Sequence, residues 1–158
     1  MKNSFDEPQA LNSVAEFHDT FNLPIESEPC IPSKERCELR INLIEEELKE
    51  LKEAIQENDL VEVIDAFCDL QYVLSGAILE FGAAARFKSF FDEVQRSNMS
   101  KVCKTLEEAE LTQDHYKRTK ATESHIVQKG DQYLVYRNSD GKVLKSVNYS
   151  PADLENML

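Results

Sequence analysis

The sequence predicts an all-α fold, with a four-helix-bundle-like core and a small C-terminal β-hairpin extension. Apolar residues recur at helical spacing through most of the N-terminal two thirds, and an almost uninterrupted apolar stretch of helical length runs from Leu60 to Leu79. Alternation of apolar and polar residues, which is typical of strands, appears only near the C-terminus. A chain of 158 residues is long enough for one core and a small appendage. We therefore expect a helical domain over residues 1–104 and an extension over residues 105–158.

The first three helices are separated by clear breaks in the pattern. A first helix is predicted over residues 9–21, followed by an extended connection that contains three prolines. A second helix is predicted over residues 34–57, with Ser33 as its N-cap. Asn58-Asp59 is placed to break the pattern and to cap a third helix that ends near Gly82. The tight turn between the second and third helices makes them antiparallel neighbours.

The remaining elements follow from weaker patterns. A fourth helix is predicted over residues 83–97, and its apolar side chains, Phe87, Phe90, Phe91 and Val94, are expected to complete the core. Residues 105–120 are highly charged, so they form either a mobile arm or a peripheral helix. Alternation on both sides of Asp140-Gly141 predicts a hairpin of residues 132–137 and 142–145.

Six acidic residues on the second and third helices are the most unusual feature of the chain. Glu62, Asp65 and Asp69 fall within an arc of roughly 60° at the helical repeat of about 100° per residue. The stretch from Leu60 to Leu79 contains no lysine or arginine. On the second helix the acids that share the arc of the apolar residues are Glu46, Glu47 and Glu50, whereas Glu45, Lys49, Lys52 and Glu53 form the solvent face.

These six carboxylates are expected to point toward a core without a local counter-charge. Burying one unpaired carboxylate costs several kcal/mol, so we expect a hard divalent cation among them. Ligation by carboxylates alone favours Mg²⁺ or Mn²⁺. Iron and zinc are disfavoured because the histidines, at positions 18, 115 and 125, lie outside these helices, and His18 is interpreted as a helix-flank residue.

Charge and composition limit the partners. The net charge is −12, with six basic and nineteen acidic residues before Arg86. Such a chain repels nucleic acid polymers, and it has neither a membrane-spanning run nor an N-terminal secretory segment. We therefore expect a cytoplasmic protein that binds no polymer and no membrane. The four cysteines lack metal-site spacing and are expected to be reduced.

The acidic motifs resemble the all-α nucleoside triphosphate pyrophosphohydrolases, the MazG-like and phosphoribosyl-ATP pyrophosphohydrolase-like group. The residues that carry the resemblance are Leu39-Arg40, Leu43-Ile44, Glu46-Glu47, Glu50-Leu51, Asp65, Asp69-Leu70, Tyr72-Val73 and Gly76. Segments similar to one bacterial and phage subgroup are Val14 to His18, Phe91 to Val94, Arg96 to Lys101, Asp140 to Lys145, Asn148-Tyr149 and Pro151. The resemblance implies Mg²⁺-dependent hydrolysis of a nucleoside triphosphate to the monophosphate and pyrophosphate.

The resemblance also implies roles for particular residues. The metal ligands would be Glu47, Glu50, Glu62 and Asp65 or Asp69, with the choice between the two aspartates left open. Glu46 would orient or deprotonate the attacking water, and substrate binding falls to Tyr72, Arg96, Asn98 and Lys101. A homodimer or homotetramer is expected. The alternatives are a phosphoribosyl-ATP pyrophosphohydrolase and a non-catalytic helical bundle that binds a partner.

Overall fold

The computed structural model describes residues 4–158, which form five α-helices and one two-stranded antiparallel hairpin. The mostly helical class and the presence of a C-terminal hairpin are confirmed. The chain divides into two compact units, one ending at Lys88 and the other formed by Ser89–Leu158. The boundary expected between residues 104 and 105 stays a prediction, because compact units need not coincide with domains. None of the described helices is both long enough and apolar enough to cross a membrane.

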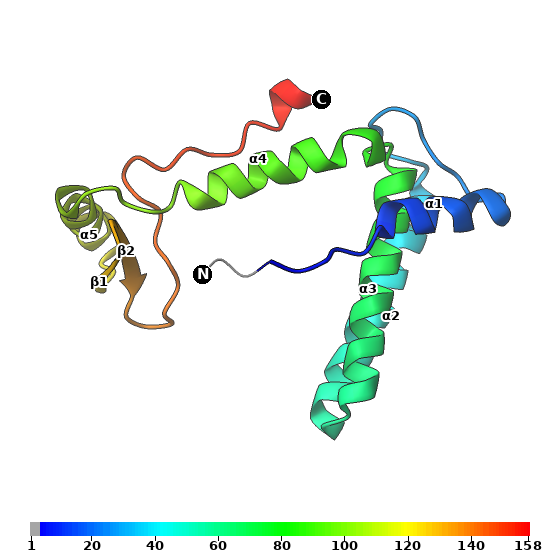
Figure 1. Ribbon diagram of the computed structural model, residues 1–158, viewed down its shortest axis with the longest axis horizontal. Coiled ribbons are helices and arrows are strands. Elements are labelled where there is room, and N and C mark those ends of the chain that lie inside the picture. The colour runs from blue at the N-terminus through cyan, green and yellow to red at the C-terminus, as the bar shows by residue number, and fades with distance from the viewer. Residues whose placement is uncertain (1–3) are drawn as a thin grey trace. The chain divides into compact units, whose positions relative to one another are not determined.

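The first unit is built on three helices, α1 (Ala10–Thr20), α2 (Lys34–Glu57) and α3 (Leu60–Glu80). Figure 1 shows α2 and α3 side by side and antiparallel, with α1 packed on α3. The predicted caps are confirmed: Ser33 Oγ accepts from Arg36 N–H at 3.4 Å, and Asp59 accepts from the first-turn amides of α3. Between the two helices Asn58 has a φ of 57°, a left-handed conformation that asparagine tolerates.

The C-terminal end of α3 lies under the connection between α1 and α2. Gly82 has a φ of +66°, and a Cβ placed there would lie 1.9 Å from the carbonyl oxygen of Glu28. Only glycine therefore fits at this position. The backbone amides of Glu26 and Cys30 donate to carbonyl oxygens of Leu79 and Phe81, at 3.1 and 3.0 Å. The proline-rich connection is thus fixed to the helix pair.

The helix α4 (Phe87–Met99) follows a short 3₁₀ turn and belongs mainly to the second unit. We expected Phe91 and Val94 to fill a core shared by four helices. Their side chains are instead 61% and 38% exposed. The four-helix-bundle-like core is therefore not confirmed, because the apolar face of α4 is not buried as such a core requires.

The helix α5 (Leu106–Lys120) shows that the charged segment is a helix and not a mobile arm. Thr105 Oγ1 accepts from Glu108 N–H at 3.1 Å, and the Glu108 carboxylate accepts from Lys104 N–H at 2.8 Å. This helix packs on the hairpin, and the shared core contains Cys103, Ala109, Val135 and Leu144. All four cysteines are free, as expected.

The predicted strand pairing is incomplete, because it missed the main partner of the strand over residues 132–137. The partner of β2 (Gln132–Arg137) is β1 (Ser124–Lys129), with a two-residue turn whose Gly130 has a φ of 64°. Residues 142–145 also return antiparallel to β2, through an isolated bridge from Val143 to Tyr136. Arg137 N–H donates to the Lys142 carbonyl at 2.9 Å, and Leu144 N–H donates to the Val135 carbonyl at 2.8 Å. The chain then leaves the sheet at Ser146, whose hydroxyl donates to the Glu108 carboxylate on α5.

Candidate functional site

The three acids on α2 differ in their exposure. Glu47 is half-buried, whereas Glu46 and Glu50 are exposed. The predicted solvent face of the same helix is confirmed by the ion pair between Lys49 and Glu53, whose Nζ and Oε1 atoms are 3.5 Å apart. At about 100° per residue, Glu47 lies on a different side of α2 from this ion pair, whereas the exposed Glu46 lies within roughly 20° of Glu53.

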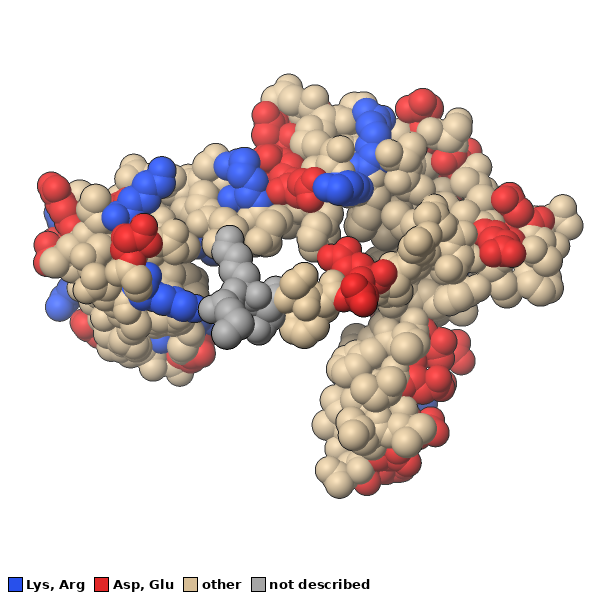
Figure 2. Space-filling model, viewed as in Figure 1, with Lys and Arg blue, Asp and Glu red and all other residues tan. Residues whose placement is uncertain are grey.

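The three acids on α3 lie along the helix that packs against α2. Asp69 is half-buried, and Glu62 and Asp65 are exposed. In Figure 2, the part of the α2–α3 pair that projects to the lower right shows mainly uncharged residues, and its acidic side chains gather along one edge. Within residues 4–158, no lysine or arginine forms an ion pair with any of the six acids.

Glu47 is the point at which acids from both helices meet. Burial raises the pKa of the Glu47 carboxyl above its usual value, and the neighbouring charges of Asp69, Glu50, Glu46 and Asp65 raise it further. A carboxylate destabilised by like charges is one that a cation would stabilise. The expectation that all six carboxylates point toward a core is wrong for Glu46, Glu50, Glu62 and Asp65, whose side chains are exposed. The charge of Asp69 on α3 nevertheless acts on Glu47 of α2.

The donor chemistry suits a hard cation, but the side chains do not form a ready-made ligand set. Among the described residues, no three acidic, histidine or cysteine side chains converge closely enough to hold a metal ion as they stand. Carboxylate oxygens are the ligands that Mg²⁺ prefers. The assignment of Glu47, Glu50, Glu62, Asp65 and Asp69 as metal ligands therefore stays a prediction.

The first unit also contains a buried polar cluster that the sequence did not reveal. The Glu80 carboxylate, which is 1% exposed, accepts hydrogen bonds from the guanidinium groups of both Arg36 and Arg40. Burial alone would raise the pKa of Glu80, but these two guanidinium groups hold the pKa below its usual value. A salt-bridged cluster therefore joins α2 to the end of α3.

His18 belongs to this cluster, so its interpretation as a helix-flank residue is wrong. The side chain is 1% exposed, and its Nδ1 lies 2.9 Å from the Pro24 carbonyl oxygen. Because a carbonyl only accepts, Nδ1 carries the proton and Nε2 accepts from Arg40 Nη2 at 3.2 Å. Two arginines one turn apart on the apolar side of α2 were the signal that could have indicated this cluster.

Tyr72 lies on α3 one turn beyond Asp69. Its ring is 40% exposed and meets the Phe17 ring of α1 edge-on, with 5.7 Å between the centroids. Together they form part of the wall of a small cavity in the first unit. Tyr72 is therefore placed where a planar ligand could contact its ring, and its predicted role in substrate binding stays a prediction.

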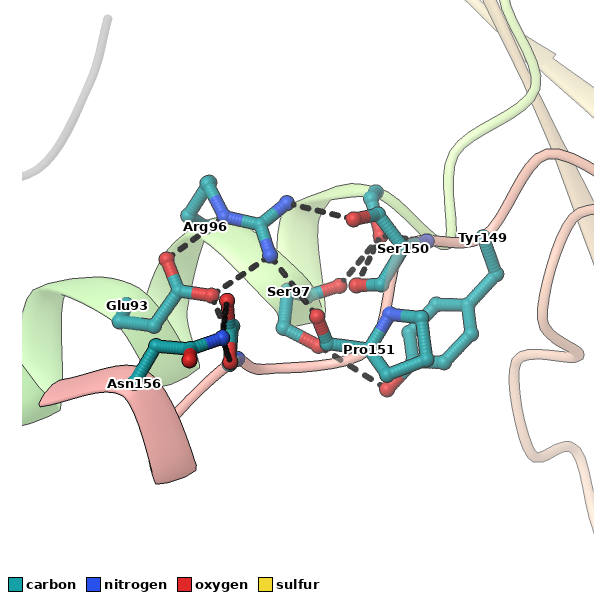
Figure 3. Close-up of polar contacts among 9 residues, drawn as sticks. Glu93, Arg96, Ser97, Tyr149, Ser150, Pro151 and Asn156 are labelled. Atoms are coloured by element: carbon teal, nitrogen blue, oxygen red, sulfur yellow. Dashed lines mark hydrogen bonds and ion pairs between the residues drawn. The ribbon is translucent and has the colours of Figure 1, made fainter.

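Arg96 holds the C-terminal segment in the second unit, as Figure 3 shows. Its guanidinium donates to both Glu93 carboxylate oxygens at 2.7 Å, to Ser150 Oγ at 3.0 Å and to the Pro151 carbonyl at 2.9 Å. The hydrogen bonds from Arg96 and from the Asp153 amide lower the pKa of Glu93 to about 2. Arg96 thus has a structural role beside its predicted contact with substrate.

Asn98 and Lys101 lie at the end of α4, close to the same tail. Lys101 Nζ donates to Asn98 Oδ1 at 2.8 Å. Nearby, Ser97 Oγ and Tyr149 OH are 2.9 Å apart, and Lys145 Nζ lies 4.3 Å from the centre of the Tyr149 ring. The hydrogen bond to Ser97, followed by the charge of Lys145, lowers the pKa of the Tyr149 hydroxyl. The predicted phosphate contacts therefore lie in a locally basic region.

Comparisons with known proteins place this geometry in a family. The model of the family described as phosphoribosyl-ATP pyrophosphohydrolase matches residues 14–98, which contain all six acids. The chain is also 24% identical to the uncharacterized protein L479 of Acanthamoeba polyphaga mimivirus, over 92% of this chain and 94% of that relative. The family description names a hydrolase that acts on a phosphoanhydride bond, which agrees with the predicted class of reaction. Because the match covers more than half of the chain, the chain belongs to the phosphoribosyl-ATP pyrophosphohydrolase family, within the MazG-like all-α pyrophosphohydrolases.

Proposed function

We propose that this chain hydrolyses a nucleoside triphosphate between its α- and β-phosphates, using Mg²⁺ or Mn²⁺, and releases a monophosphate and pyrophosphate. The observation that carries the proposal is the environment of Glu47. Its half-buried carboxyl faces like charges from α2 and α3, and no described cation neutralises them. The family match supports a pyrophosphohydrolase acting on a nucleotide.

The metal would be held by Glu47, Glu50, Glu62 and one or both of Asp65 and Asp69. When bound, such an ion neutralises phosphate charge and lowers the pKa of coordinated water. Glu47 and Asp69 are the half-buried members, so they would define the inner side of the site. The exposed acids Glu50 and Asp65 would complete the ligand set from the solvent side.

The other residues would position the reactants. Glu46 is next to Glu47 in the chain and exposed, so its carboxylate is free to accept a proton from the attacking water. Asn98 and Lys101 would donate to phosphate oxygens, together with Arg96. In phosphoryl transfer, positioning and charge stabilisation supply most of the catalysis. The proposal therefore needs no nucleophilic side chain.

Phosphoribosyl-ATP is the second candidate substrate, because the matching family carries its name. It contains the same kind of phosphoanhydride bond, so the proposed metal site serves both substrates. The extension after residue 104 makes this alternative the weaker one. A direct comparison of the two substrates separates them.

A second copy of the chain would cover the apolar surface of the helix pair. Large apolar side chains of α2 and α3 are exposed, among them Ile41, Leu48, Ile55, Leu60, Val61, Ile64, Phe67 and Leu74. Exposed apolar side chains that gather on one helix pair are typical of an interaction site. Closed symmetric homo-oligomers are the commonest assemblies of soluble proteins. We therefore propose a homodimer or homotetramer.

The test is pyrophosphate release from a panel of ribo- and deoxynucleoside triphosphates and phosphoribosyl-ATP, with Mg²⁺. We expect release from at least one triphosphate, and strong loss in Glu50→Gln and Asp65→Asn. Glu45→Gln is the matched control, because Glu45 is an exposed glutamate outside the acidic arc of the same helix. Activity that survives both substitutions would refute the metal site. No release from any substrate would favour a non-catalytic binding protein.

A further inference from the structure

We propose that Lys145 and Tyr149, on the C-terminal segment of the second unit, complete a binding site for the phosphate chain of the substrate together with Lys101. This inference rests on the proposed function, in which Arg96, Asn98 and Lys101 contact phosphate. Lys145 and Lys101 would supply the positive charge, and Tyr149 would hold Lys145 in place. All of these residues belong to the second unit.

The backbone on both sides of Lys145 is fixed. Leu144 is 6% exposed and belongs to the core of the second unit, and its N–H donates to a carbonyl of β2 at 2.8 Å. Ser146 is 4% exposed, and its hydroxyl donates to the Glu108 carboxylate. The alternation of exposed and buried residues over 143–146 is that of a strand, so Lys145 lies on the exposed side. The Lys145 side chain is therefore presented to solvent by an ordered segment.

Arg96 and Ser100 fix the part of the segment that follows. The Arg96 guanidinium donates to Ser150 Oγ, to the Pro151 carbonyl and to both Glu93 carboxylate oxygens. Four of its five N–H groups are thus used within the second unit. Ser100 Oγ also accepts from Ser150 N–H at 2.9 Å. Arg96 therefore contributes to the proposed site mainly by holding the C-terminal segment on α4.

Tyr149 is the point at which the two lysines meet. Its hydroxyl lies 2.9 Å from Oγ of Ser97, a side chain of α4 that is 4% exposed, as Figure 3 shows. Lys145 Nζ lies 4.3 Å from the centre of the Tyr149 ring, which is a cation–π contact. The hydrogen bond to Ser97 lowers the pKa of the Tyr149 hydroxyl most, and the charges of Lys145 and Lys101 lower it further. Both ammonium groups therefore act on the same oxygen atom.

The charges of these two lysines are not neutralised by acids. Within residues 4–158, no carboxylate forms an ion pair with Lys101 or Lys145, and Lys101 Nζ donates to the Asn98 side-chain oxygen at 2.8 Å. The carboxylates that contact the same segment have other donors: Glu93 accepts from an arginine, and Glu108 accepts from a hydroxyl and a backbone amide. Two ammonium groups that share one place without a counter-charge favour an anion as their ligand.

A phosphate chain suits this pair of lysines better than a single carboxylate. The lysine ammonium group is a compact charge with three donors, and lysine is a usual ligand of phosphate in proteins. A triphosphate carries charged oxygens on neighbouring phosphorus atoms, so one molecule can contact both ammonium groups. The net charge of −12 disfavours longer polyanions such as nucleic acids. The expected occupant is therefore the phosphate chain of a nucleotide.

The test measures binding of inorganic tripolyphosphate to the purified chain, by isothermal titration calorimetry at low salt and without metal. This probe has the phosphate chain of a nucleotide but neither base nor sugar. Lys145→Gln and Lys101→Gln should each weaken binding roughly tenfold, the value of one hydrogen bond to a charged group. Lys142→Gln is the matched control, because Lys142 is an exposed lysine of the same segment whose Nζ lies 3.8 Å from the Asp140 carboxylate. The affinity of this control should be unchanged.

Two further variants test whether Tyr149 acts through Lys145. Tyr149→Phe keeps the ring beside the Lys145 ammonium group, whereas Tyr149→Leu removes it. Tyr149→Phe should therefore bind tripolyphosphate more tightly than Tyr149→Leu. When Tyr149 is already Leu, adding Lys145→Gln should weaken binding much less than it does in the unmodified chain, because Lys145 is no longer held in place. A purely structural role for Tyr149 would leave the two effects additive.

An unmodified chain that does not bind tripolyphosphate would overturn the inference, as would a loss of affinity in Lys142→Gln equal to that in Lys145→Gln. Additive effects of Tyr149→Leu and Lys145→Gln would overturn the positioning role of Tyr149. Tripolyphosphate binding requires neither hydrolysis nor metal. A chain that binds the probe through Lys145 but releases no pyrophosphate from any nucleotide therefore refutes the proposed function alone. Pyrophosphate release with the same KM in Lys145→Gln as in the unmodified chain refutes this inference alone.

Discussion

Replacing Glu47 by Gln should have opposite effects on the metal-free and the metal-bound protein. The substitution keeps the size of the side chain and removes its negative charge. Burial destabilises that charge most, followed by the like charges of Asp69 and Glu50. Without metal, the variant loses only repulsion. With metal, it loses a ligand. The sign of the stability change therefore reports whether this carboxylate exists to bind a cation.

The size of the metal-free effect follows from the neighbours of Glu47. Like charges one turn apart on a helix cost roughly 0.2–0.5 kcal/mol. Glu47 faces Glu50 on its own helix and Asp69 on the other, so the variant should gain roughly 0.5–1 kcal/mol at pH 7. For a chain of this size, that raises the melting temperature by roughly 1–4 °C.

The stability gain of metal-free Glu47→Gln should also depend on pH. The pKa of Glu47 in the folded chain lies above its ordinary value of 4.5. The ionised Glu47 carboxylate therefore does not lower the stability of the folded chain at pH values below 4.5. The loss of stability develops as the pH rises above 4.5 and through the pKa that Glu47 has in the folded chain. The melting temperatures of Glu47→Gln and the unmodified chain should coincide in mild acid and separate toward neutral pH.

Thermal unfolding in a chelator and in excess Mg²⁺ is the assay. At a concentration a hundred times its dissociation constant, Mg²⁺ should stabilise the unmodified chain by about 2.7 kcal/mol, and Glu47→Gln by much less. Glu45→Gln should behave like the unmodified chain in both conditions. If Glu47→Gln melts lower in chelator, or if Mg²⁺ raises its melting temperature as much as that of the unmodified chain, the reasoning is wrong.

Glu80→Gln should lower the free energy of unfolding by roughly 3 kcal/mol, because two arginines lose their buried partner; urea unfolding measures this, and a change near zero would show that the cluster is dispensable. Acid should release the C-terminal tail, since the Glu93 contacts hold above the ordinary pKa of 4.5 and are lost as the pH falls toward about 2. Hydrogen exchange at the Asp153 amide measures that release, and the exchange rate should also rise at pH 7 in Glu93→Gln. If the amide stays protected both in acid and in Glu93→Gln, the proposed role of Glu93 is wrong. Phe67→Asp should reduce the particle mass in light scattering, because the 53% exposed Phe67 is proposed to lie against another copy; an unchanged mass would argue against that interface.

The helices α2 and α3 could be predicted because local signals fix where each begins. Ser33 caps α2 through a contact three residues away, and Asp59 caps α3 in the same manner. These contacts depend only on neighbouring residues. The spacing of the acids likewise determined which of them share a side of each helix. Local patterns were therefore sufficient to predict the bounds of α2, but not that Glu46, Glu50, Glu62 and Asp65 would be exposed.

The remaining features depend on residues that are distant in the sequence. Asp140-Gly141 does form a turn, and residues 142–144 return beside β2, but the main partner of β2 is the segment before it, with Ile126 opposite Val135. The pairing with this earlier segment is made by tertiary packing, which local propensity does not encode. The buried cluster shows the same limit, because His18 and Glu80 are 22 and 40 residues from Arg40.

In the part of the chain that the structure describes, the α2–α3 pair has an apolar surface that nothing covers and a group of acids that no cation neutralises. On α2 these two surfaces lie on different sides of the helix. Ile41, Leu48 and Ile55 are exposed and follow one another at seven-residue spacing, so they share one face of α2. Glu47 and Glu50 lie roughly 100° or more from that face. Another copy of the chain would cover the first surface, but its apolar side chains would not relieve the repulsion at Glu47. Assembly and cation binding therefore depend on different residues of one helix pair. A variant that blocks assembly should still bind Mg²⁺, and a variant that blocks Mg²⁺ binding should still assemble.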